Sequence, residues 1–234
     1  MKLGIMQPYI FPYAGYFQLV KAVDKFVIYD DVNFIKQGWI NRNNILLNGK
    51  GVLFTIPLED ASSFRRINEI GLPVQLYEKW KIKFKMTLSM AYSKAPFFKE
   101  TFSLVTSILE TEERTIANLA GTSIAKICEY LKIYTHILPS SSIYNNSQLS
   151  GKERVIDICR REGATEYVNA QGGQELYSKD FFFNHGISLS FIKFQPIPYL
   201  QFKSEFVPYL SIIDALMFNS AEKMQNLLNQ YELV

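Results

Sequence analysis

Polar residues that could bind a ligand are concentrated in the first 43 positions of the chain. Gln7 follows a short apolar run over residues 3–6, and the Asp30-Asp31 pair follows a second run over residues 26–29. Both runs have the composition of buried strands, with the spacing of a short helix over residues 17–23 between them. Parallel strands of an open sheet bind ligands outside their carboxyl ends. The spacing therefore predicts that Gln7 and the aspartate pair face one crevice.

The two aspartates suit more than one kind of ligand. Asp30 and Asp31 could hold a divalent cation, or they could accept hydrogen bonds from ribose or sugar hydroxyls. Lys36 follows shortly after them, and we predict that Gln7, Asp30, Asp31 and Lys36 form the catalytic set. Apart from that cation, no cofactor is expected. The alternative interpretation is that the aspartates only form a turn at the end of a strand.

The loop between the two strands carries a second signal. Tyr13-Ala14-Gly15-Tyr16 has the spacing of the H-x-G-H motif with which nucleotidyl transferases hold a phosphate, with tyrosines in place of both histidines. A tyrosine hydroxyl donates to a phosphate but carries no positive charge at neutral pH. Gly15 allows close approach of the backbone, and the start of a helix favours an anion. Proline and glycine are also common before helices for steric reasons alone.

A group of cationic, amide and aromatic side chains follows the second strand. Lys36 and Arg42 could bind a diphosphate, while Trp39 could stack on a base. Asn41 and Asn43 would bring amides to the same crevice. The competing interpretation is that these side chains are solvated surface residues that bind nothing. The predicted substrate-binding residues from this part of the chain are Tyr13, Gly15, Tyr16, Trp39, Asn41, Arg42 and Asn43.

Composition places the chain among folded globular proteins. Of its 234 residues, 48% are hydrophobic and 20% are charged, which excludes general disorder. A formal charge of +3 is too small to indicate a nucleic-acid partner, yet it allows an anionic small molecule. No apolar run approaches the roughly eighteen residues that span a bilayer, and the chain starts with a strand instead of a signal peptide. We therefore expect a cytoplasmic protein without a membrane span, and a homodimer is compatible with these features.

Several common signatures are absent from the sequence. It contains no G-x-S-x-G, P-loop, Cys-x-x-Cys or G-x-G-x-x-G motif, which removes the usual hydrolase, NTPase, zinc and dinucleotide signals. Cys128 and Cys159 lie among apolar neighbours and are predicted to be buried thiols. His136 and His185 are isolated, so no metal site is predicted around either of them.

Strands and helices alternate along the rest of the chain, which predicts a mainly parallel sheet with helices on both faces. The middle helices interrupt this rhythm. We therefore expect a single α/β domain over residues 1–234, with residues 76–131 as an inserted helical subdomain or lid. The expected elements are a hairpin over 44–47 and 51–57, helices over 76–92, 98–109 and 111–131, a strand over 135–138, a helix from 151, strands over 165–169 and 189–194, and helices over 208–218 and 221–231.

Motifs spread over nearly the whole chain resemble the WbqC-like protein family. In order, they are Gln7-Pro8, Pro12, Gly15-Tyr16, Asp30-Asp31, Lys36, Trp39, Asn41-Arg42-Asn43, Lys94 to Phe98, Gly163 to Thr165 and Glu205 to Asp214. The resemblance implies a bacterial protein that acts on an activated sugar in the synthesis of O-antigen lipopolysaccharide or another surface polysaccharide. It also adds Glu205 and Tyr209 to the expected substrate-binding residues.

Three functions remain open from the sequence. The leading hypothesis is a transferase that places an acyl or aminoacyl group on a nucleotide-linked amino sugar, which would then be the small-molecule partner. The second is a nucleotidyltransferase or adenylate-forming ligase with a degenerate H-x-G-H loop. The third is a non-catalytic sugar-binding or assembly protein.

Overall fold

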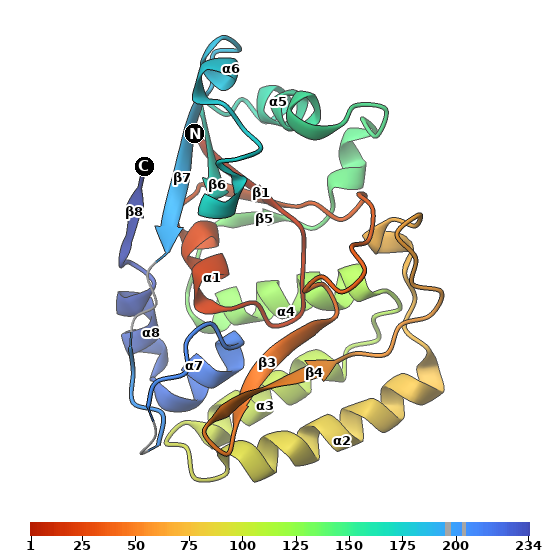
Figure 1. Ribbon diagram of the computed structural model, residues 1–234, viewed down its shortest axis with the longest axis vertical. Coiled ribbons are helices and arrows are strands. Elements are labelled where there is room, and N and C mark those ends of the chain that lie inside the picture. The colour runs from red at the N-terminus through yellow and green to blue at the C-terminus, as the bar shows by residue number, and fades with distance from the viewer. Residues whose placement is uncertain (195–197, 203–204) are drawn as a thin grey trace.

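A computed structural model of the protein describes residues 1–194, 198–202 and 205–234 and shows an α/β fold (Figure 1). Its central sheet has six strands in the order β5-β2-β1-β6-β7-β8, and only the edge strand β8 runs antiparallel, against β7. The predicted, mainly parallel sheet is confirmed. The strands are β1 (Lys2–Met6), β2 (Lys25–Ile28), β5 (His136–Leu138), β6 (Glu166–Ala170), β7 (Ser188–Phe194) and β8 (Tyr231–Leu233).

The strand order reverses direction between β1 and β6. From β1 the chain continues to β2 and β5 on one side, whereas β6 and β7 lie on the other side. At such a switch point the loops after the two neighbouring strands diverge and leave a crevice at their carboxyl ends. β1 and β2 are parallel, as predicted, with Met6 opposite Ile28. The loops that carry Gln7 and the aspartate pair therefore begin at the same edge of the sheet.

Helices cover both faces of the sheet because alternate strand residues point to opposite sides. On β2, Phe26 and Ile28 enter the larger core, which includes helix α1, whereas Val27 enters the smaller core with α5 and α6. Figure 1 shows α1 and α5 on opposite sides of the sheet. The helices outside the middle of the chain are α1 (Ala14–Lys21), α5 (Gly151–Arg161), α6 (Lys179–Phe183), α7 (Ile212–Phe218) and α8 (Ala221–Leu227).

The middle of the chain forms a hairpin followed by three helices. β3 (Arg42–Leu47) and β4 (Lys50–Thr55) pair antiparallel through the predicted Asn48-Gly49 turn, in which both residues have positive φ. The helices are α2 (Val74–Tyr92), α3 (Phe98–Leu109) and α4 (Ile116–Tyr130). Their buried side chains belong to the same larger core as those of α1. That this segment acts as a lid stays a prediction.

Several helix boundaries differ from the expected ones, and each difference has a structural cause. Helix α4 begins at Ile116 and not at residue 111, because the Thr115 hydroxyl caps it by accepting the Asn118 N–H at 3.2 Å. Helix α7 begins only at Ile212, after Tyr209, whose φ of 58° is not helical. The expected helix over 221–231 ends at residue 227, because its last positions turn into the edge strand β8.

The cysteine prediction is confirmed. Cys128 in α4 and Cys159 in α5 are both free and buried. Burial raises the pKa of each thiol to about 12, so both are protonated at physiological pH.

Short 3-10 helices complete the described structure at η1 (Ile67–Glu69), η2 (Ser141–Tyr144) and η3 (Gln171–Gly173). Within the described ranges, no helix combines the length and the apolar character needed to cross a membrane.

Candidate functional site

A cavity of about 620 Å³ opens at the carboxyl ends of β1, β6 and β7, where the strand order reverses. The loop after β1, the loop before β3 and the turn after β6 form its walls. Tyr209 contributes from the segment before α7. The lining residues are Met6, Gln7, Pro8, Tyr9, Tyr13, Gly15, Tyr16, Leu19, Ile35, Gly38, Trp39, Ile40, Asn43, Ala170, Gln171, Gly172, Ile192, Phe194 and Tyr209.

Aromatic rings dominate the cavity wall. Six of the lining side chains are aromatic, and several pack edge to face. The ring centroids of Tyr13 and Phe194 lie 5.1 Å apart, and those of Phe194 and Tyr209 lie 6.1 Å apart. Trp39 is 54% exposed and Tyr209 is 60% exposed, so both rings have faces free for stacking. The wall therefore suits a planar base or the apolar face of a sugar ring.

The polar groups of the cavity are uncharged. Among the described residues, those that line it include no Asp, Glu, Lys or Arg, and the polar side chains are three carboxamides and the tyrosine hydroxyls. Burial raises the pKa of Tyr13 and raises that of Tyr16 well above its usual value, so both phenols stay neutral at physiological pH. The carboxamides come from Gln7, Asn43 and Gln171.

Asn43 holds the loop after β1 in place. Its Nδ2 donates to the Phe11 carbonyl at 2.7 Å, and the Ser211 hydroxyl donates to the same carbonyl at 2.8 Å. Phe11 is fully buried with a φ of 44°, a conformation that a bulky side chain adopts only under such restraint. The Ile212 N–H adds a hydrogen bond to the Pro12 carbonyl at 2.8 Å. Strand β3 and helix α7 thus fix the loop that carries Gln7 and the tyrosines.

Gly15 has a packing role at the start of α1. A Cβ atom at this position would lie 2.4 Å from Cε2 of Tyr13, so the Tyr13 ring occupies the space that a side chain would need. The close approach expected at Gly15 is therefore made by an aromatic ring of the same loop. Tyr16 is also engaged, because its hydroxyl donates to the Gln7 carbonyl at 3.2 Å. The two tyrosines of the H-x-G-H-like sequence support the cavity wall.

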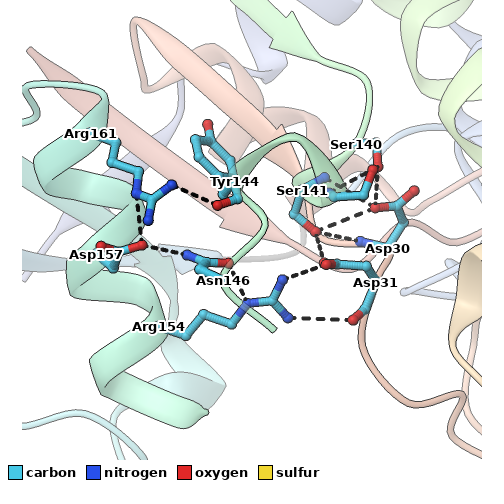
Figure 2. Close-up of polar contacts among 10 residues, drawn as sticks. Asp30, Asp31, Ser140, Ser141, Tyr144, Asn146, Arg154, Asp157 and Arg161 are labelled. Atoms are coloured by element: carbon cyan, nitrogen blue, oxygen red, sulfur yellow. Dashed lines mark hydrogen bonds and ion pairs between the residues drawn. The ribbon is translucent and has the colours of Figure 1, made fainter. Parts of the chain in front are cut away.

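The aspartate pair lies outside the cavity lining, in a separate buried network (Figure 2). Asp30 Oδ1 accepts hydrogen bonds from the Ser140 hydroxyl at 2.8 Å and from the Ser141 N–H at 3.1 Å. Asp31 accepts a short hydrogen bond from the Ser141 hydroxyl and pairs with Arg154, whose Nη2 lies 2.5 Å from Oδ2. Both aspartates are turned toward the loop after β5, one strand farther from the switch point than Gln7.

The network continues into helix α5. Arg154 Nε donates to Asn146 Oδ1 at 2.9 Å, and Asn146 Nδ2 donates to Asp157 Oδ2 at 2.7 Å (Figure 2). Burial raises the pKa of Asp30, although the hydrogen bonds from the two serines oppose the shift. In the part of the chain that the structure describes, no three His, Cys, Asp or Glu side chains gather as a metal site. The aspartates join the loops after β2 and β5 to helix α5.

The predicted cations lie on the loop that forms one cavity wall. Lys36 is exposed, and its neighbours Ile35 and Gly38 line the cavity while it does not. Arg42 Nε donates to the Gly38 carbonyl at 2.8 Å and so braces this loop. Asn41 also braces the chain, because its Nδ2 donates to the Ile56 carbonyl at 2.8 Å. The common pocket predicted from the sequence therefore holds Gln7 and Tyr16 but not Asp30, Lys36 or Arg42.

The segment from Glu205 to Asp214 reaches the site at one residue only. Tyr209 lines the cavity, whereas Glu205 is exposed outside it. Asp214 is fully buried below and accepts hydrogen bonds from the Tyr92 hydroxyl at 2.9 Å and the Tyr199 hydroxyl at 2.6 Å. Gln201 Nε2 donates to the same carboxylate at 2.6 Å. Of the two residues that the family resemblance adds to the expected binding residues, Tyr209 lines the cavity, and a binding role for Glu205 stays a prediction.

Sequence reasoning missed several lining residues. Gln171 and Gly172 follow β6, and Phe194 ends β7. The strand-to-glycine turn after β6 was the available signal, but its place beside the loop after β1 follows only from the pairing of β1 with β6. Tyr9 was also missed, although it lies in the same loop as Gln7.

Comparison with known proteins assigns the chain to a family. Residues 7–226 match the WbqC-like protein family, a range that includes every residue lining the cavity except Met6. The chain belongs to the WbqC-like protein family. A relative from Mycobacterium tuberculosis (strain ATCC 25618 / H37Rv), "Uncharacterized protein Rv1507c", is 30% identical over 224 residues, which cover 93% of each chain. No solved structure matches the chain.

Proposed function

We propose that this WbqC-like chain is a transferase of bacterial surface-polysaccharide biosynthesis that places an acyl or aminoacyl group on a nucleotide-linked amino sugar. The observation that carries the proposal is the cavity at the switch point, with its aromatic walls and three carboxamides. Its volume of about 620 Å³ falls within the range of small-molecule sites. The O-antigen context rests on the resemblance of the chain's motifs to the family.

The cavity chemistry supports an uncharged base or sugar ring inside it and phosphates outside. Trp39 and Tyr209 offer exposed ring faces, while the carboxamides of Gln7 and Gln171 can both donate and accept hydrogen bonds and so suit hydroxyls and base edges. A diphosphate does not suit this interior, since no lining residue in the described chain is charged. Lys36 and Arg42 flank the wall formed by Gly38 and would meet the phosphates at the mouth.

Of the predicted catalytic set, Gln7 is the residue that lines the cavity. Its uncharged carboxamide would orient the amino sugar and donate to the oxyanion that forms when an amine attacks an acyl group. The catalytic roles of Asp30, Asp31 and Lys36 stay predictions. The contacts of the two aspartates support a positioning role, because they fix the loop that leaves β2.

A nucleotidyltransferase is the second candidate, and one observation favours it. Tyr13-Ala14-Gly15-Tyr16 begins helix α1 directly after the loop from β1, and three of these residues line the cavity. This is the place at which an H-x-G-H motif would meet a nucleotide. The Tyr16 hydroxyl is already bonded to the Gln7 carbonyl, however, and the tyrosines bring no positive charge to a phosphate.

Titration calorimetry with nucleotide-linked amino sugars tests the proposal directly. We expect saturable binding that weakens in Trp39→Ala and is unchanged in Tyr134→Ala, a matched loss of an exposed aromatic ring that does not line the cavity. Mass spectrometry of the bound sugar, in mixtures with acyl and aminoacyl donors, should then show an added group on its amine.

Other outcomes would select other functions. Release of pyrophosphate from a nucleoside triphosphate would favour the nucleotidyltransferase. Tight binding of a nucleotide sugar without turnover would favour a non-catalytic sugar-binding protein. An absence of binding to every nucleotide sugar would contradict the proposal.

A further inference from the structure

Helix α2 carries a row of exposed apolar side chains on its outer side. Leu76 is 58% exposed, Ile82 58%, Met86 61% and Met90 78%. The last three are spaced four residues apart and so lie along one line of the helix. The opposite side of α2 is fixed in the core by Tyr77, Lys81, Phe84, Leu88 and Tyr92.

Two lysines lie among these apolar residues. At about 100° per residue, Lys79 and Lys83 fall between the line of Ile82 and Met86 and the position of Leu76. Both lysines are exposed. Glu78 lies one turn before Ile82 and is 57% exposed, so it borders these residues, and its carboxylate pairs with Lys81 Nζ at 2.8 Å. We call the set Leu76, Lys79, Ile82, Lys83, Met86 and Met90 the outer face of α2; the carboxylate that borders it, Glu78, is already paired with Lys81.

The position of α2 leaves this face open. Figure 1 shows α2 along the lower edge of the molecule, with the β3–β4 hairpin and α3 on its inner side. Phe54 of the hairpin packs on Phe84 with ring centroids 4.6 Å apart, and Trp80 stacks on Phe84 at 4.8 Å. The inner side is thus fully used for packing, and the outer face is not required for the fold.

We propose that the outer face of α2 docks on an anionic lipid surface. A helix that lies in the plane of a bilayer places apolar side chains at the level of the head groups and lysines on the lipid phosphates. Lysines close to the membrane surface are further attracted by the negative surface potential of anionic lipids. Methionine suits such a surface, because its unbranched and polarisable side chain adapts to irregular partners.

A second copy of the chain fits this face less well. A two-fold interface places the same residues against each other, so it would bring four lysines together, while the bordering Glu78 carboxylates are already paired with Lys81. Anionic lipid supplies the charge that the face lacks. The proposal does not depend on the transferase proposed above, because no residue of the outer face lines the cavity.

Vesicle flotation tests the proposal with the full chain. Wild-type protein should float with phosphatidylcholine vesicles that contain phosphatidylglycerol and remain in solution with pure phosphatidylcholine. The double variant Lys79→Gln/Lys83→Gln should bind the anionic vesicles about ten-fold more weakly or worse. Ile82→Ser/Met86→Ser should lose a similar or larger factor, roughly ten-fold or more, by removing the apolar part of the contact.

The control removes exposed apolar side chains elsewhere. Ile143→Ser and Leu176→Ser, which are 55% and 72% exposed in the wild type, should float like the wild type. Circular dichroism of each variant should match the wild type, because every substituted side chain is exposed.

Three outcomes would overturn the proposal. The first is failure of the wild type to float with anionic vesicles at low ionic strength, and the second is an equal loss in the control variants. The third is a monomer–dimer equilibrium, seen by sedimentation, that Ile82→Ser/Met86→Ser abolishes without any vesicle binding, which would assign the face to a second copy.

Discussion

Arg154 of helix α5 forms an ion pair with Asp31, with Nη2 of the arginine 2.5 Å from Oδ2 of the aspartate. The two side chains are only 4% and 3% exposed. The pair joins positions 123 residues apart and fixes the loop after β2 to helix α5. Removing one partner would leave the other charge buried without a counter-charge, which costs far more than the loss of a surface pair.

We expect Arg154→Met to lower the free energy of unfolding by about 3–5 kcal/mol, because it leaves the Asp31 carboxylate buried and unpaired. Arg160→Met is the matched control, since Arg160 lies on the same helix with an exposed side chain. That control should change stability by no more than about 0.5 kcal/mol. Urea unfolding of both variants measures the difference, and equal losses would contradict the structural role of the buried pair.

Gly15→Ala is expected to destabilise the protein by about 1–3 kcal/mol, because the new Cβ would overlap the Tyr13 ring. Tyr13→Ala in the same chain should recover part of that loss by removing the ring. Gly121→Ala is the control, because nothing lies within 4 Å of a Cβ there and the residue sits inside helix α4. It should gain about 0.5–1 kcal/mol. Thermal unfolding of Gly15→Ala, Tyr13→Ala, the double variant and Gly121→Ala checks whether Gly15 and Tyr13 are coupled.

Arg42→Ala should weaken nucleotide-sugar binding about ten-fold or more, because a charge-assisted hydrogen bond contributes roughly 1.5–3 kcal/mol net. Lys36→Ala should act in the same direction. Binding of the corresponding nucleoside, which has no phosphate, should change much less in both variants. Calorimetric titration measures the affinity of each variant for the nucleoside and for the nucleotide sugar. An equal loss for nucleoside and nucleotide sugar would mean that Arg42 acts only by bracing the Gly38 loop.

The buried carboxyl of Asp214 predicts a dependence of stability on pH. Burial raises its pKa above the ordinary value of about 3.9, despite the hydrogen bonds from Tyr199, Gln201 and Tyr92 that lower it. The folded protein therefore holds this proton more tightly than the unfolded chain does. The stabilisation is complete below the ordinary pKa and is lost as the pH rises through the raised pKa.

Asp214→Asn removes the titrating carboxyl, so the difference between wild type and variant gives the contribution of Asp214 alone. The difference in free energy of unfolding between wild type and variant should shrink as the pH rises through that window, because only the wild type loses the contribution. Urea unfolding over the acid range measures the difference. A difference that stays constant with pH would contradict the predicted direction.

Much of the fold was predictable because it depends on local patterns. The alternation of strands and helices predicted a mainly parallel sheet, and Asn48-Gly49 predicted the hairpin turn, since both signals are set by neighbouring residues. The edge strand β8 was missed, because Tyr231 forms a strand only by pairing with Phe194 of β7. The late start of α7 was also missed, because Ser211 caps it while donating to the distant Phe11 carbonyl.

The candidate site also combines features that depend on neighbouring residues with features that depend on distant contacts. Gln7 directly follows β1, and Tyr16 stands in the first turn of the next helix, so both could be predicted to line a cavity from their place in the chain. Asp30 follows a strand as well, but its carboxylate turns to Ser140 and Ser141. No sequence pattern around position 30 indicates that serines more than a hundred residues away would donate hydrogen bonds to this carboxylate.

By itself, the sequence determined the family, the kind of sheet and the loop from Gln7 to Tyr16, because motifs and periodicity are properties of short segments. Only the tertiary structure decided which polar residues share a cavity. Parallel pairing of β1 with β6 placed Gln171 beside the loop of Gln7, while burial paired Asp31 with Arg154. A buried charge is stable only when an opposite charge or hydrogen-bonding groups lie beside it, and the fold supplies these groups from residues far away in the sequence.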